Sequence, residues 1–191
     1  MPSWEELENA CLGCQNCGLG ATRTNVVIGV GNREADVLFV GEGPGYHEDM
    51  QGVPFVGAAG QLLDKMLAAI EMDRQQVYIA NIVKCRPPQN RDPAPDEIEA
   101  CIRFLRYQML LIKPKIVCCL GRIAGQNIIG PSFRITREHG TWIERKGIWL
   151  TSTYHPSALL RDESKKRDAW ADLQGLRRKL DELRGTTESS D

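Results

Sequence analysis

The chain has 191 residues, 42% of them hydrophobic and 26% charged, a balance that suits one compact domain with a sizeable core. Its formal net charge of −1 does not indicate a polyanionic partner, so any nucleic-acid surface must come from local basic patches. No apolar run is long enough to span a bilayer, and residues 1–8 are too acidic and polar for a secretory signal, which predicts a cytoplasmic protein.

Helical and extended patterns alternate along the chain. Residues 3–10 predict a short acidic helix, with Ser3 and Glu6 as the two members of a capping box. Apolar patterning predicts strands at residues 26–30, 36–40, 77–83, 115–120 and 147–154, and helices at 61–72, from 95 onward, at 122–129 and at 163–183. Such alternation favours an α/β fold, a single-domain three-layer sandwich with a central, mainly parallel sheet of about four strands flanked by helices.

Polar and glycine-rich residues follow four of the predicted strands. They are residues 41–45, Asn81, residues 121–122 and residues 155–157. In parallel sheets the ligand site lies outside the carboxyl ends of the strands. We therefore expect these segments to converge on one rim of the sheet.

The cysteines are spaced as for a metal centre. Cys14 and Cys17 are separated by two residues, so their thiolates can bind one centre from a single turn, and Cys85 and Cys101 would complete it if the fold brings them close. Seven cysteines without a secretory segment do not suggest a disulfide framework. Four thiolates suit tetrahedral zinc and a [4Fe–4S] cluster equally well. Cys11 precedes Cys14 at the same spacing and competes as a ligand.

Four stretches of the chain stand out together: the cysteine quartet, residues 41–45 with 48–49 and 54–57, residues 81–91, and residues 155–161. In this order they resemble the family 4 uracil-DNA glycosylases, the iron–sulfur type. The resemblance runs from residue 14 to 161, and the order and content of the stretches together are highly specific. It implies a glycosylase domain over residues 1–185, and residues 186–191 read as a disordered tail from their own sequence. It also implies a structural [4Fe–4S] cluster held by Cys14, Cys17, Cys85 and Cys101.

The family's activity is the hydrolysis of the N-glycosidic bond of uracil in DNA, which leaves an abasic site for base excision repair. The base must first leave the duplex stack and enter a close-fitting pocket. The resemblance implies a monofunctional enzyme, and we expect no strand cleavage because no lysine is placed as an obvious Schiff-base nucleophile. Uracil-containing DNA is the expected partner of a monomer, and no segment suggests docking to a sliding clamp.

The resemblance assigns a contact to each part of an extrahelical uracil. Phe55 is implied to stack on the base, and Asn81 to pair with O4 and N3, since a carboxamide offers both an acceptor and donors. Cytosine presents the reverse pattern, so Asn81 also discriminates. His155 is implied to donate a hydrogen bond to the charge that develops on O2. Taken singly, these residues equally suit a core ring, a strand-end turn and a structural histidine.

Residues of the first motif are implied to build the pocket wall. Gly41, Glu42 and Gly43 follow a predicted strand, and Glu48 is implied to crowd the position of the methyl group of thymine. Glu42 offers a carboxylate near the attacking water, although it can equally position the pocket backbone. Gly43 stands where related glycosylases carry an aspartate that orients the water, and a glycine cannot act as a base. How the water is activated therefore stays open.

Local basic charge predicts the DNA contacts. Lys84, Arg86 and Arg91 form one basic loop. Ser157 is expected to contact a phosphate beside the flipped nucleotide, and an apolar wedge from Leu159 and Leu160, with Arg161, to fill the gap in the duplex. The predicted DNA-binding residues are Arg86, Arg91, Ser157, Leu159 and Arg161.

Two other classes of protein share parts of this pattern. A relative that traps its sugar cation covalently carries a basic, histidine-containing insertion after the middle motif, whereas residues 86–95 contain no histidine. A non-hydrolytic iron–sulfur DNA-binding or redox module would explain the cysteines but would leave Phe55, Asn81 and residues 155–157 without a purpose. Activity after substitution of Asn81 in protein that keeps its cluster separates these classes.

Overall fold

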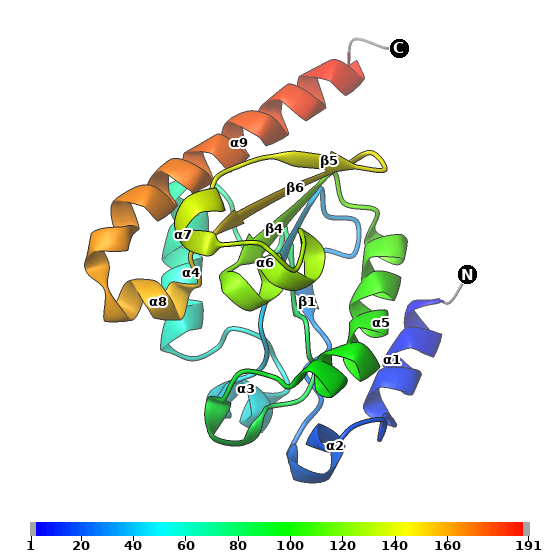
Figure 1. The fold of residues 1–191 in the computed structure, drawn as a ribbon. Helices are drawn as coiled ribbons and strands as arrows, with labels where there is room; N and C mark the ends of the chain where they lie inside the picture. The colour runs from blue at the N-terminus through cyan, green and yellow to red at the C-terminus, as the bar shows by residue number, and fades with distance from the viewer. Residues whose placement is uncertain (1–2, 189–191) are drawn as a thin grey trace.

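The computed structural model describes residues 3–188, which form one sheet with helices on both faces (Figure 1). Within this range the sheet has six strands in the order β1-β3-β2-β4-β6-β5. The parallel inner strands are β3 (Tyr78–Asn81), β2 (Val37–Gly41), β4 (Ile116–Leu120) and β6 (Ile148–Thr153). The edge strands β1 (Val30–Gly31) and β5 (Ile143–Arg145) run antiparallel to their neighbours. The predicted α/β fold is confirmed, and two short edge strands raise the strand number from about four to six.

The helices divide between the two faces of the sheet. They are α1 (Trp4–Leu12), α2 (Leu19–Thr22), α3 (Tyr46–Gln51), α4 (Ala58–Ala69), α5 (Pro95–Ile112), α6 (Arg122–Ile128), α7 (Ile135–Glu138), α8 (Pro156–Arg161) and α9 (Lys166–Glu188). Alternate residues of β2 point to opposite faces. Leu38 and Val40 pack in a core with residues of α1, α5 and α6, whereas Val37 and Phe39 pack with residues of α4, α8 and α9.

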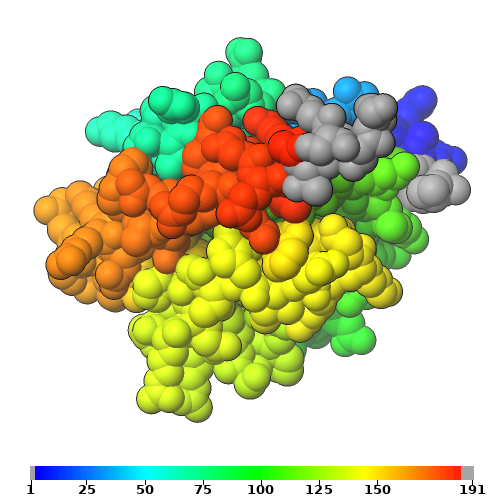
Figure 2. All heavy atoms as spheres, turned by 90° about the horizontal axis from the view of Figure 1, so that it is seen from above, coloured from blue at the N-terminus to red at the C-terminus, as the bar shows by residue number. Residues whose placement is uncertain are grey.

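Helix α9 extends across the second of these faces. Figure 2 shows it between the segment of α4 and the hairpin of β5 and β6. A helix was predicted here at residues 163–183. In the structure α9 begins three residues later, at Lys166, and continues to Glu188. Of the segment expected as a tail, residues 186–188 have helical backbone, and residues 189–191 lie outside the described residues. Between residues 3 and 188, no helix combines the length and apolar character needed to cross a membrane.

Two local predictions for the N-terminal part of the chain have different outcomes: the capping box of α1 is confirmed, and the strand at 26–30 is not. The predicted capping box at α1 is present: the Ser3 side chain accepts from the Glu6 backbone N–H at 3.2 Å, and Glu6 Oε2 accepts from the Ser3 N–H at 2.6 Å. The strand predicted at 26–30 is wrong except for Val30. Gly29, with a φ of 154°, departs from regular strand backbone directly before β1, and only Val30 and Gly31 join the ladder.

Candidate functional site

A cavity of about 520 Å³ lies at the carboxyl ends of the parallel strands. Each inner strand supplies lining residues: Glu42 follows β2, Asn81 ends β3, Gly121 and Arg122 follow β4, and His155 follows β6. The four segments meet because parallel strands all present their carboxyl ends to the same edge. Nine predicted site residues line the cavity: Glu42, Gly43, Glu48, Phe55, Asn81, Arg91, His155, Ser157 and Arg161.

Phe55 and Asn81 form the floor of the cavity above Gly41. A Cβ atom at Gly41 would lie 2.5 Å from Asn81 Oδ1 and 2.7 Å from Phe55 Cζ, so any side chain there would displace one of them. Gly41 therefore shapes the site by allowing this close approach, without lining the cavity itself. The Phe55 ring is 5% exposed, and its centroid lies 5.5 Å from that of His155.

The turn that carries Phe55 is held in an uncommon conformation. Phe55 has a φ of 54°, in the left-handed region that a bulky residue rarely adopts. Arg74 fixes the turn from below: its guanidinium donates to the carbonyl of Pro54 at 3.0 Å and to the carbonyl of Phe55. Arg74 is separated from this turn by about twenty residues, and nothing in the sequence indicates the contact.

Asn81 presents an unpartnered acceptor to the cavity floor. Its side chain is 2% exposed, and within the described residues its Oδ1 is buried without a hydrogen bond. A buried acceptor left without a donor costs about 1–3 kcal/mol. Such an atom at the wall of a cavity suits a ligand that brings its own N–H group.

His155 is a neutral imidazole with a defined tautomer. Its Nδ1 accepts a hydrogen bond from the Ser157 backbone N–H at 3.1 Å, so Nδ1 carries no proton and the ring proton is on Nε2. The Ser157 hydroxyl lies 2.7 Å from the same nitrogen and donates to it. The pKa of His155 is lowered to about 4, mainly by burial and also by Arg161, with Glu48 opposing the shift. At neutral pH the side chain is therefore an uncharged N–H donor.

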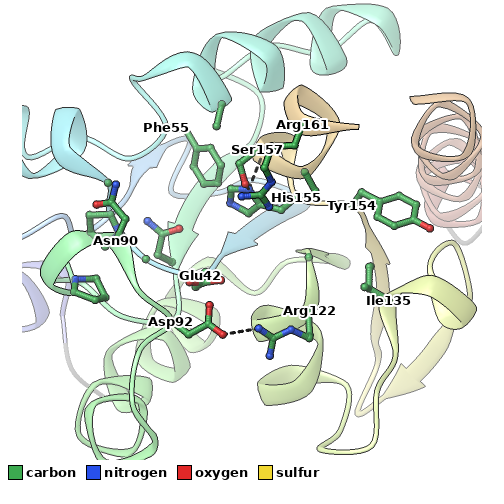
Figure 3. A pocket seen from close by; sticks show the side chains of 18 of the residues that line it. Glu42, Phe55, Asn90, Asp92, Arg122, Ile135, Tyr154, His155, Ser157 and Arg161 are labelled. Carbon is green, nitrogen blue, oxygen red and sulfur yellow. Dashed lines mark hydrogen bonds and ion pairs between the residues drawn. The ribbon is translucent and has the colours of Figure 1, made fainter. Parts of the chain in front are cut away.

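Glu42 lies across the cavity from Phe55 and His155, next to the ion pair of Asp92 and Arg122 (Figure 3). The pKa of Glu42 is raised to about 7, mainly by burial and also by the Asp92 carboxylate, with Arg122 and Arg161 opposing the shift. Arg122 Nη2 and Asp92 Oδ2 are 2.5 Å apart, and both side chains are about half exposed. A carboxyl group whose pKa is shifted towards neutral by burial, and which faces a cavity, is typical of an acid–base site.

Glu48 combines a place on the wall with a structural contact. Its Oε1 accepts from the backbone N–H groups of Val56 and Gly57, both at 2.9 Å. The carboxylate therefore fixes the segment directly after Phe55, a role that was not predicted. Its position on the cavity wall is where the sequence prediction placed it.

The predicted DNA-binding residues have different surroundings. Arg161 and Ser157 line the cavity, and Arg91 lines it while its guanidinium forms two hydrogen bonds to Glu97, at 2.9 and 2.7 Å. The prediction that Leu159 contacts DNA is wrong, because this side chain is 1% exposed and packs in the core under α8. Leu160, its neighbour, is 48% exposed and is the apolar residue of α8 that can reach a partner.

Lys84 does not belong to the basic loop, because it is buried. Its Nζ donates to the carbonyl of Asn81 at 2.8 Å and to Gln108 Oε1 at 2.7 Å. Its backbone N–H donates to Cys101 Sγ at 3.3 Å. One residue thus connects the end of β3, which presents Asn81, with the cysteine-rich part of the molecule.

The four predicted ligands lie around one small pocket. Cys14, Cys17, Cys85 and Cys101 line it together with Cys11. Arg23 Nη1 donates to Cys85 Sγ at 3.4 Å and to the carbonyl of Cys14 at 2.7 Å. An all-sulfur set with N–H donors to the sulfurs fits a thiolate-held centre. In residues 3–185, however, no three or more His, Cys, Asp or Glu side chains are grouped as ligands of one metal ion.

Residues 28–174 match the family model described as the uracil DNA glycosylase superfamily. The chain is 46% identical over 168 residues to the type-4 uracil-DNA glycosylase of Archaeoglobus fulgidus, with 84% of each chain covered. It is 42% identical over 186 residues to the enzyme of that name from Sulfurisphaera tokodaii, covering 93% of this chain and 84% of the relative. It is 45% identical over 155 residues to the type-4 uracil-DNA glycosylase of Thermotoga maritima, covering 79% of this chain and 80% of the relative.

Proposed function

Because this chain belongs to the uracil DNA glycosylase superfamily, we propose that it hydrolyses the N-glycosidic bond of uracil in DNA and leaves an abasic site for base excision repair. The observation that carries the proposal is the joint placement of Phe55, Asn81 and His155 around one cavity. Together they offer the contacts that an extrahelical uracil needs, namely stacking, pairing of the base edge and stabilisation of the departing base.

Recognition of the base would rest on Asn81. Its unpartnered Oδ1 matches the N3–H of uracil, and its amide N–H groups match O4. Cytosine has an acceptor at N3 and a donor at N4, so the same carboxamide would be left facing like groups. Glu48, fixed by Val56 and Gly57, is a rigid wall that would exclude the methyl group of thymine.

Cleavage would depend on His155. As the glycosidic bond breaks, negative charge develops on O2 of the uracil, and the Nε2–H of a neutral imidazole can donate to it. The Ser157 N–H holds the ring in this tautomer, so little reorganisation is needed during the reaction. A fixed donor of this kind is worth about 3–4 kcal/mol of activation free energy.

Glu42 is the residue that we propose to position the attacking water and to stabilise the sugar cation. If its carboxylate is the active form, kcat/KM should rise with pH through about 7, the pKa of Glu42, and then level off. A pH–rate profile of wild type and Glu42→Gln checks this. The variant should be slower at alkaline pH and should lack the rise near neutrality.

The same substitution has an opposite effect on stability. A glutamate whose folded-state pKa is raised binds its proton more tightly in the folded protein, so its ionisation destabilises the fold as pH rises towards that pKa. Glu42→Gln should therefore melt at a higher temperature than wild type at alkaline pH and not at mildly acidic pH. If the melting temperatures of wild type and Glu42→Gln depend on pH in the same way, ionisation of Glu42 does not affect the fold, and the residue only shapes the pocket.

The cysteine pocket is proposed to hold a [4Fe–4S] cluster through Cys14, Cys17, Cys85 and Cys101, with zinc as the alternative for the same four thiolates. When bound, such a centre would connect the segment after α1 with residues 85–101. Glycosidic hydrolysis transfers no electrons, so the proposed role is structural. Arg23 and the Lys84 backbone N–H would donate to the ligand sulfurs.

We propose a monofunctional enzyme that acts as a monomer on DNA in the cytoplasm. The sequence showed no obvious lysine nucleophile, yet Lys165 lines the cavity. Its Nζ is 3.3 Å from Asp162 Oδ2 and 5.6 Å from the centre of the Tyr154 ring, so the ammonium group is engaged by these two side chains.

The experiment that tests the proposal is incubation of the protein with labelled oligonucleotides that contain one deoxyuridine, or deoxycytidine or thymidine at the same position. We expect strand cleavage only at deoxyuridine and only after alkali. Cleavage without alkali would indicate attack by a lysine such as Lys165, and an alkali-labile protein–DNA adduct would indicate covalent trapping. No change in the DNA would contradict the proposed activity.

A further inference from the structure

Tyr46 is a large aromatic residue on the surface next to the cavity. It begins α3, directly after the lining residue Gly45, and its side chain is 52% exposed. An exposed tyrosine by itself is ordinary. Its chain neighbours Pro44, Gly45 and Glu48 line the cavity, so Tyr46 stands beside the cavity without lining it.

Arg86 places a cation on this ring. Its guanidinium carbon lies 5.3 Å from the centroid of the Tyr46 ring. Its Nε donates to Asn90 Oδ1 at 2.7 Å, and Asn90 lies on the cavity wall (Figure 3). Tyr46, Arg86 and Asn90 therefore form a continuous chain of contacts from the outer surface to the cavity.

The loop that supports Arg86 is held in an unusual form. Gln89 and Asn90 both have positive φ values, 56° and 55°, which are uncommon for residues other than glycine. Two such residues in succession fix Asn90, and through it the direction of the Arg86 side chain. Strained backbone of this kind is often found next to ligand sites.

From these contacts, and on the basis of the proposed function, we propose that Tyr46 and Arg86 form a second nucleobase subsite. It would bind the base of the nucleotide next to the flipped uracil by stacking. The face of a phenol ring together with a guanidinium group binds any base, because each base has a π-face. The subsite would therefore add affinity without adding preference for a particular neighbouring sequence.

The chemistry of this pair favours nucleic acid over an apolar partner. The half-buried Arg86 keeps a positive charge over the ring, and two other cations, Arg122 and Arg161, line the neighbouring cavity. Single-stranded DNA offers both kinds of contact: its phosphates can bind the arginines, and an unstacked base can stack on the Tyr46 ring. When the uracil is extrahelical, its neighbour loses a stacking partner, and Tyr46 can replace it.

The test uses binding of single-stranded oligonucleotides that carry a non-cleavable deoxyuridine analogue, followed by fluorescence anisotropy. Tyr46→Ala should raise Kd by about 5- to 160-fold, the range expected for loss of one stacked base. Tyr46→Phe, which keeps the ring, should retain most of the affinity. Tyr107→Ala is the matched control, since Tyr107 is 40% exposed on α5 and does not line the cavity.

The position of the stacked base is tested on the DNA side. In two further oligonucleotides the base on the 5′ or the 3′ side of the uracil is replaced by an abasic spacer. The effect of Tyr46→Ala should disappear with one of these spacers and persist with the other. Wild-type affinity of Tyr46→Ala, or an equal loss with both spacers, would overturn the subsite.

This result is independent of whether the protein excises uracil. If wild-type protein fails to release uracil from a cleavable oligonucleotide but shows the Tyr46-dependent binding, the proposed function fails and the subsite stands. If uracil release is normal and Tyr46→Ala binds like wild type, the subsite fails and the proposed function stands.

Discussion

Replacing His155 with alanine is expected to lower kcat for uracil release by about 100- to 1000-fold, because it removes the donor that faces the departing base. The ring is neutral and carries its proton on Nε2, since Nδ1 accepts from the Ser157 N–H. The donor acts mainly on charge that develops in the transition state, so KM should change little. Single-turnover release of uracil from a labelled oligonucleotide measures the effect.

Controls separate this role from a general loss of structure. His155→Gln can still donate a hydrogen bond and should recover part of the rate. His47→Ala removes an exposed histidine that does not line the cavity and should leave kcat unchanged. A rate for His155→Ala within a few-fold of wild type would show that the imidazole does not stabilise the leaving group.

The inner strands and the rim of the site were predictable because local hydrophobic patterns define the strands, and their parallel arrangement then decides which residues meet. The apolar runs at 36–40 and 115–120 became β2 and β4, which are buried throughout. Once the inner strands are parallel, residues after them must share one edge, and this places Glu42, Asn81 and His155 together. The edge strands β1 and β5 are too short to show the two-residue alternation of a strand, so hydrophobic patterning does not define them.

Contacts between distant segments could not be predicted. The burial of Lys84 depends on acceptors at Asn81 and Gln108, which only the folded chain brings together. Arg74 and its hold on the Phe55 turn have no local signal either. The choice between Leu159 and Leu160 depends on the rotation of α8, a helix of six residues in which hydrophobic periodicity is undefined. The cysteine spacing identified the residues around the second pocket but could not choose the metal.

Asn81→Ala is expected to lower kcat/KM for uracil release by about 30- to 160-fold, the effect of losing two hydrogen bonds of about 1–1.5 kcal/mol each. The alanine would also remove the basis for rejecting cytosine. Asn81 is suited to this test because its Oδ1 has no hydrogen-bond partner within the described residues. Removing this oxygen therefore breaks no hydrogen bond of the fold.

The most direct test of this account is therefore single-turnover release of uracil by wild type and Asn81→Ala, each with its iron and sulfide content measured. Wild-type release, and a variant that keeps the same metal content and melting temperature but loses most of the rate, is the predicted result. Equal rates for the two proteins would contradict the account, because the cavity at the strand ends would then not be the place where uracil is recognised.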